Sequence, residues 1–166
     1  MSRLMIAALF AAALSAQSAS ATVFTFYVSL DGYNEVTSGG VPGQGDPDGY
    51  GTATLMIDDV AGTISWNIEV FLIGLPVGGA HIHNAASNTN GPIVVDFSGQ
   101  LTGSGLADSD LAAVLANPTQ YYVNVHNGAF PGGAIRGQLG TPTPEPASLA
   151  LLGVGASALL AARRRR

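Results

Sequence analysis

The stretch TISWNIEVF, residues 63–71, shows the pattern on which the fold prediction depends. Its apolar side chains alternate with polar ones, so that Ile64, Trp66, Ile68 and Val70 fall on one side and Ser65, Asn67 and Glu69 on the other. Because successive side chains of a strand point to opposite faces, this alternation predicts a β-strand with one buried face. Residues 24–30 repeat the pattern, and residues 50–57 form a further predicted strand, joined to 63–71 by a turn at 58–62.

Four further segments have the apolar character of short strands: residues 80–83, 92–97, 121–126 and 134–139. One short helix is predicted at residues 108–116, where two aspartates precede an apolar face and Asn117-Pro118 ends the segment. About seven short strands with frequent turns favour an all-β fold, an antiparallel two-sheet sandwich of Greek-key type. We therefore expect one β-domain over residues 22–140. The chain has no cysteine and so no disulfides, but a domain of this size can bury a core without them.

The first 21 residues have the three parts of a secretory signal peptide. Arg3 supplies the positive end, an uncharged apolar run extends from Leu4 to Leu14, and Ala19-Ser20-Ala21 is a cleavage site with small residues. A first buried helix is the alternative, but the run has no polar face and strand-like sequence follows it at once. We expect an exported protein whose mature chain begins at Thr22.

Residues 141–166 form a second segment outside the predicted domain. Prolines make residues 141–146 unsuitable for a strand or a helix, an uncharged stretch follows at 147–162, and four arginines end the chain. The stretch predicts a C-terminal transmembrane helix about 24 Å long, with the arginines at its cytoplasmic end. Together with the helix and the arginines, Pro144, Glu145 and Pro146 resemble the PEP-CTERM sorting signal of exported bacterial proteins.

The PEP-CTERM resemblance implies a location and two partners. An exosortase-type processing enzyme would act on the tail. Until it does, the protein would stay membrane-anchored in the periplasm or cell envelope, and afterwards it would be released to the outside. Such proteins are typically linked to extracellular polysaccharide, which is therefore a candidate partner. A plain C-terminal membrane anchor is the alternative; it explains the helix and the arginines but not the Pro-Glu-Pro motif.

Charge is distributed unevenly along the chain and excludes several functions. The formal net charge is −5, yet five of the six basic residues lie in the two terminal segments, and between residues 22 and 140 one arginine faces ten carboxylates. Such an acidic domain cannot neutralise phosphates, so nucleic acid is excluded as a partner. The chain has no cysteine, which excludes a cysteine nucleophile, and it has no Gly-x-Ser-x-Gly motif to support hydrolase chemistry. We expect no enzymatic activity.

The single cation of the predicted domain is Arg136. Because ten carboxylates compete for one guanidinium, we expect a structural ion pair with a residue such as Asp96, Glu35 or Glu69. The alternative is a solvent-exposed arginine on a strand.

All three histidines of the chain lie in the predicted domain. His81 and His83 are two residues apart on one strand and so project from the same face, and His126 shares a face with Asn124 on another strand. If the two strands are close, the three imidazoles form a candidate site for Zn²⁺ or Cu²⁺ with a fourth position open. The alternative is structural: the ring nitrogens would hydrogen-bond backbone carbonyls and fix the loop at residues 84–90.

Six segments, in chain order, resemble the CHRD domain, a module repeated in chordin and found singly in many exported bacterial proteins: Gly32-Tyr33-Asn34-Glu35-Val36, residues 49–55, Ala80-His81-Ile82-His83, residues 91–97, residues 122–126 and residues 131–139. The resemblance spans about residues 23–139. Thr37, where the family usually has proline, and the long insertion at 38–48 are departures. The family is not known to be enzymatic, so the resemblance implies an extracytoplasmic binding or structural module.

Overall fold

The computed structural model describes residues 21–144 of the 166-residue chain. Residues 1–20 of the predicted signal peptide, the predicted C-terminal transmembrane helix, the arginine tail and two residues of the sorting motif, Glu145 and Pro146, lie outside the described residues. Over residues 21–144, the structure has no helix that is both long enough and apolar enough to cross a membrane.

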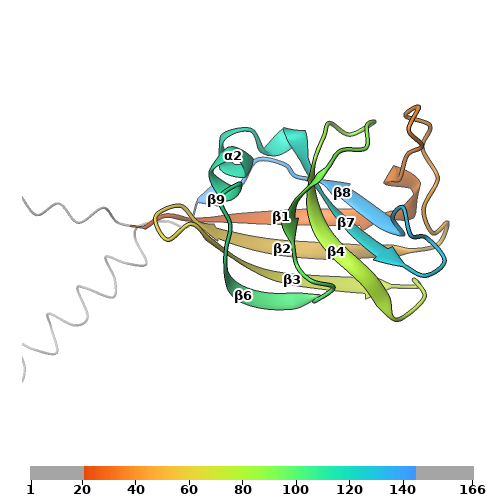
Figure 1. The fold of residues 1–166 in the computed structure, drawn as a ribbon, viewed down its shortest axis with the longest axis horizontal. Helices are drawn as coiled ribbons and strands as arrows, with labels where there is room; N and C mark the ends of the chain where they lie inside the picture. The colour runs from red at the N-terminus through yellow and green to blue at the C-terminus, as the bar shows by residue number, and fades with distance from the viewer. Residues whose placement is uncertain (1–20, 145–166) are drawn as a thin grey trace, which may run out of the picture.

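Within residues 21–144, nine strands form one antiparallel sheet (Figure 1). Their bounds are β1 (Val23–Asp31), β2 (Tyr50–Asp58), β3 (Thr63–Phe71), β4 (Val77–Asn84), β5 (Ile93–Asp96), β6 (Thr102–Ala107), β7 (Tyr121–Asn127), β8 (Ile135–Gln138) and β9 (Thr143–Pro144). The order along the sheet is β5-β4-β7-β8-β1-β2-β3-β6, and β9 pairs with β1. The helical elements are the 3₁₀ turns η1 (Gly32–Asn34) and η2 (Pro118–Gln120) and the α-helix α2 (Leu111–Ala116).

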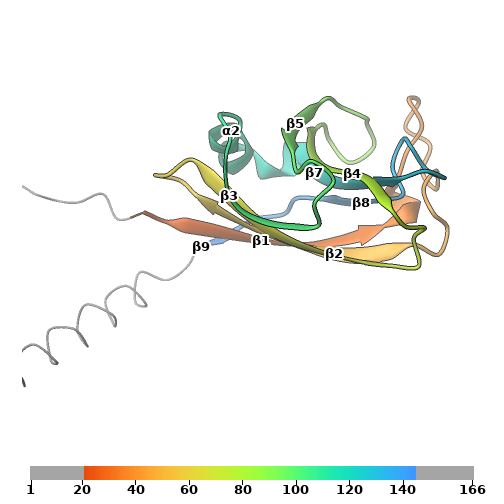
Figure 2. The same ribbon diagram turned by 60° about the horizontal axis from the view of Figure 1, so that its bottom comes forward.

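The sheet curls so that β4, β5, β7 and β8 form a layer over β1, β2 and β3 (Figure 2). The prediction of an all-β antiparallel fold with one short helix is confirmed, but the prediction of two separate sheets is wrong. Asp31 of β1 pairs with Arg136 of β8, so the ladder of backbone pairs continues from one layer to the other. A single core fills the space between the layers and includes Phe26, Leu55, Trp66, Ile82, Val123 and Ile135.

Two strands were not predicted. The segment TGSGLA of β6 has no apolar alternation, but it pairs with β3 and lies against Trp66, whose ring occupies the space that a side chain at Gly103 would need. Strand β9 contradicts the expectation that residues 141–146 form no strand. It pairs with the first residues of β1 where the four-residue β8 does not reach, and proline is tolerated at such a sheet edge.

Strands β4, β7 and β8 have one apolar and one polar face. Their apolar side chains point into the core, as in the cross-strand pairs of Ala80 with Val125 and of Ile82 with Val123. The opposite side, which we call the polar face, carries Gly79, His81, His83, Tyr122, Asn124, His126, Arg136 and Gln138. Loops cover it: Gln138 Nε2 donates to Ala85 O at 2.9 Å, and Asn34 Nδ2 donates to Arg136 O at 3.1 Å.

Arg136 is 1% exposed and holds the β4–β5 loop on the polar face. Its Nη1 donates to Asn90 Oδ1 at 3.1 Å, and its Nη2 donates to the carbonyls of Ala86 at 3.0 Å and Thr89 at 2.9 Å. The guanidinium carbon lies 3.4 Å from the centroid of the Tyr122 ring. This buried charge is therefore stabilised by loop carbonyls, one amide oxygen and the face of an aromatic ring.

The predicted ion pair of Arg136 is wrong. Within residues 21–144, no carboxylate, including those of Asp96, Glu35 and Glu69, lies within 4.0 Å of the guanidinium. Asp96 and Glu69 are exposed, whereas the loop brings its carbonyls directly to the buried group. Glu35 is near enough for the arginine charge to act against the rise in its pKa, but it makes no direct contact of this kind.

We expect Arg136→Gln to lower the free energy of unfolding by about 3 kcal/mol, because hydrogen bonds to a charged group contribute about 1.5–3 kcal/mol and buried carbonyls lose their donor. Arg136→Lys should lose nearly as much, since an ammonium lacks the planar fork that reaches three acceptors. Urea unfolding of the metal-free protein measures both. A lysine variant as stable as the wild type would mean that charge alone matters at this position.

Candidate metal centre

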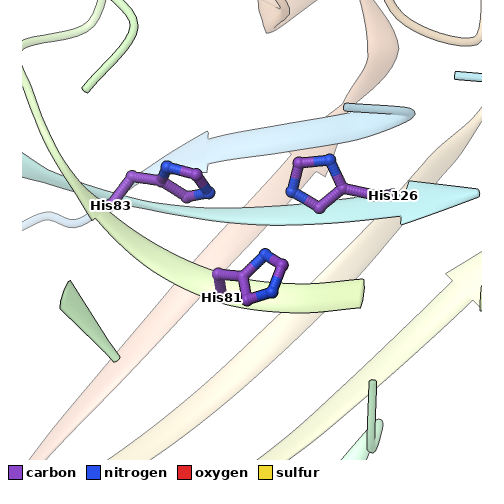
Figure 3. Close-up of side chains that lie close together, drawn as sticks. All are labelled: His81, His83 and His126. Carbon is purple, nitrogen blue, oxygen red and sulfur yellow. The ribbon is translucent and has the colours of Figure 1, made fainter. Parts of the chain in front are cut away.

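The pairing of β4 with β7 brings the three histidines together. His81 and His83 project from the same face of β4, and Gly79 on that face pairs directly with His126 of β7. The register shifts between Val77 and Gly79, which marks a bulge next to the pair. Figure 3 shows the three rings facing a common centre, two from β4 and one from β7. The condition stated in the sequence analysis, that the two strands lie close together, is therefore met.

The rings are close enough to hold one ion. Their centroids are separated by 5.0 Å for His81 and His126, 5.6 Å for His81 and His83, and 5.8 Å for His83 and His126. One nitrogen from each ring can be chosen so that all three lie within 4.8 Å of one another. Tetrahedral coordination at Zn–N distances of ~2.05 Å separates ligand nitrogens by about 3.4 Å, so the rings would need to approach slightly.

Backbone carbonyls fix two of the three tautomers. Nδ1 of His83 lies 2.9 Å from Gly91 O, and Nδ1 of His126 lies 3.0 Å from Pro131 O. A carbonyl oxygen can only accept a hydrogen bond, so each Nδ1 carries the proton. The lone pair of each ring is then on Nε2, as in metal sites where a second group orients the ligating histidine.

His81 is oriented the other way. Its Nε2 lies 3.5 Å from Asp96 Oδ1, a contact that favours a proton on Nε2 and leaves the lone pair on Nδ1. Nδ1 of His81 and Nε2 of His83 and of His126 are buried, and no group among residues 21–144 forms a hydrogen bond with them. Each imidazole thus has one anchored side and one free nitrogen.

Electrostatics keep the three rings uncharged. Burial lowers the pKa of all three histidines, and that of His126 falls from 6.5 to about 4 despite its hydrogen bond with Pro131. Charge on the neighbouring histidines adds to the lowering for His83 and His126. At neutral pH the site therefore presents lone pairs and no positive charge, which is the state that a metal ion requires.

Gly79 provides the space that His81 occupies. A Cβ at this position would lie 2.6 Å from His81 Cε1 and 3.6 Å from His126 Cδ2. A side chain here would displace the His81 ring from the cluster. A Cβ at the neighbouring Gly78, by contrast, would have no atom closer than 3.8 Å.

Sequence reasoning missed Gly79, Asp96 and the carbonyls of Gly91 and Pro131. Glycine two residues before His81 was a usable signal for Gly79, because positions 79, 81 and 83 share a face. Asp96 follows the apolar residues of a strand, but its place opposite His81 depends on the β4–β5 register. The structural role considered for the histidines is also present, since two rings anchor carbonyls of the loops through the nitrogens that point away from the cluster.

Arg136 is on the same face but not in the cluster. Its guanidinium lies over the ring of Tyr122, which also stacks with the ring of His83 at a centroid distance of 4.9 Å. Of the predicted sorting motif, Pro144 is the second residue of β9.

Two family models match the chain. A model described as the CHRD domain matches residues 26–139, and one described as the PEP-CTERM protein-sorting motif matches residues 142–166. The second match indicates export and processing by an exosortase. No curated protein and no solved structure matches the chain.

The histidine cluster predicts a dependence of stability on pH in the metal-free protein. Folding holds His126 uncharged with a pKa of about 4, whereas the unfolded chain takes up the proton near 6.5, so acid favours unfolding between these values. Relative to that of His126→Gln, the free energy of unfolding of the wild type should therefore fall by about 2 kcal/mol from pH 7 to pH 4. The upper limit is ~1.36 kcal/mol for each unit by which folding lowers the pKa, and we reduce it because the ring is partly exposed. Urea unfolding in EDTA at a series of pH values measures it, and a constant difference would contradict the burial argument.

Proposed function

The chain belongs to the CHRD domain family, and from this premise we propose that it is an exported, non-enzymatic protein whose domain binds one Cu²⁺ or Zn²⁺ ion through His81, His83 and His126. The PEP-CTERM match supports its delivery to the cell envelope, with the C-terminal segment as the membrane anchor until the tail is processed. The domain is then the part that acts outside the cytoplasm.

One observation supports the metal proposal above the others: three buried imidazole nitrogens without hydrogen-bond partners in residues 21–144 converge on one point. Buried polar atoms are normally satisfied, and three such atoms this close together can share one partner. That partner has to accept three lone pairs, so a cation fits and an anion or a carbonyl does not.

The three imidazole ligands narrow the choice of metal ion. Three imidazoles suit Zn²⁺ and Cu²⁺, whereas Ca²⁺ and Mg²⁺ prefer oxygen ligands. The excess of carboxylates between residues 22 and 140 attracts cations of every kind to the domain, so the charge aids capture and the imidazoles provide the selectivity.

Calorimetric titration of the metal-free protein with Zn²⁺ and with Cu²⁺ should give one equivalent bound with micromolar or tighter affinity. Replacing any one of the three histidines by alanine should weaken binding at least about 100-fold, and Asp96→Asn about 10-fold, because it only orients His81. Ca²⁺ should not compete. Affinity weaker than micromolar for both ions would rule out the site.

Adjacent glycines provide a matched pair of variants. Gly79→Ala places a methyl group against His81 and should weaken metal binding about 10-fold or more, whereas Gly78→Ala meets no close atom and should bind as the wild type does. The thermal shift produced by one equivalent of Zn²⁺ measures the difference. Equal shifts in both variants would show that the ion binds elsewhere.

A further inference from the structure

A second group of unsatisfied polar atoms lies beyond the loop that orients His126. Pro131, whose carbonyl accepts from His126, also lines a cavity of about 230 Å³ between this loop and the loop after β1. Figures 1 and 2 both place the loop after β1 beside the β7–β8 connection. The walls include Val36, Ala129, Phe130 and Pro131, and Glu35 also lines the cavity.

Glu35 is 3% exposed, and its Oε1 has no hydrogen-bond partner among the described residues. An unpaired buried carboxylate oxygen is costly, and the cost is visible in the pKa of Glu35, which burial raises to about 7 against the opposing effects of Arg136 and Asn124. Asn124 Oδ1, on β7, is likewise a buried acceptor without a donor in residues 21–144.

The amide and guanidinium donors near Glu35 form their hydrogen bonds with other acceptors. Asn124 Nδ2, which acts to lower the pKa of Glu35, donates to Gly132 O at 3.5 Å. Asn90 Nδ2 donates to Val36 O at 2.9 Å, and Gln44 Nε2 donates to Pro42 O at 3.2 Å. Arg136 is committed to the β4–β5 loop through the three hydrogen bonds described above. The chain contains no lysine, so no lysine ammonium of its own can reach Glu35.

Two glycines keep the space around the carboxylate open. Gly133 has a φ of 142°, a conformation that other residues rarely adopt, and a Cβ there would collide with Glu35 Oε1. A Cβ at Gly45 would lie 2.8 Å from Glu35 Cγ. Any side chain at position 133 would fill the space in front of the unpaired oxygen.

We infer that this cavity binds an alkylammonium group from outside the chain, with its nitrogen donating to Glu35 Oε1 and its carbon chain against Val36, Phe130 and Pro131. An ammonium has three donors and no acceptor, which complements a cavity whose unsatisfied atom is an acceptor. A calcium ion fits less well, because it takes six to eight oxygens and usually several carboxylates, and a single carboxylate borders this cavity. The inference does not depend on metal binding.

The test uses the full-length chain in a non-ionic detergent, free of metal and in phosphate buffer without amines at pH 8. The chain has three glutamates, at 35, 69 and 145, so ¹³C labelling of glutamate carboxyl groups gives three signals. Titration with n-propylammonium should shift the Glu35 signal saturably, with a dissociation constant in the millimolar range or below. Glu35→Gln should weaken binding at least tenfold, while Glu69→Gln, which removes an exposed charge from β3, should not.

Two ligands serve as controls on the wild type: n-propanol, which has no charge, and tetramethylammonium, which is charged but has no N–H. Because they need no variant, they keep the test decisive if Glu35→Gln fails to fold. A tripeptide with a central lysine and the same peptide with that lysine acetylated identify the source. Tighter binding of the lysine peptide than of propylammonium points to a protein partner, and equal or weaker binding to a free amine. No saturable shift, equal binding of propanol, or undiminished binding by a folded Glu35→Gln variant would overturn the inference.

Discussion

The register of β4 against β7 is the constraint on which the site depends. It sets Gly79 opposite His126 and so places an empty position where the rings of His81 and His126 need room. A shift of one residue would turn the histidines of β4 toward the core and Ile82 toward the loops. The buried pairs of Ile82 with Val123 and of Ala80 with Val125 oppose such a shift, so the hydrophobic core fixes the geometry of the polar face.

The polar face differs from the core in how it is stabilised. Its side chains are buried under loops rather than under a second sheet, and each must find hydrogen bonds there. Arg136 binds the β4–β5 loop, Tyr122 is stacked between Arg136 and His83, and the same loop supplies the Gly91 carbonyl that fixes the His83 tautomer. The atoms that remain unsatisfied among residues 21–144 are therefore informative, because they lie in a region where most polar groups are paired.

Most of the strands could be predicted from the sequence, because apolar alternation reports which face is buried. The curl into one sheet could not, since it depends on the long-range pairing of Asp31 with Arg136. Strand β6 was missed because its glycines fit against Trp66 instead of supplying apolar side chains. Of the site, the shared face of His81 and His83 followed from strand geometry, whereas the distance to His126 required the sheet order.

Arg136 shows the limit of reasoning from charge. Ten carboxylates made an ion pair the natural expectation, yet a fully buried guanidinium is satisfied by whichever acceptors the fold brings to it, and here they are carbonyls of one loop. Glu35 shows the converse, since a carboxylate with an arginine nearby is left with an unpaired oxygen. Pairing depends on the positions of loops, which a sequence pattern does not report.

X-ray absorption spectroscopy of the protein loaded with one equivalent of Zn²⁺ distinguishes an ion held by three imidazoles from one bound elsewhere. We expect a first shell of nitrogen and oxygen at about 2.0–2.1 Å, with the outer-shell scattering of three histidine rings and one further light ligand. A spectrum with one histidine or none, dominated by oxygen ligands, would place the ion on the acidic surface and rule out the three-histidine site.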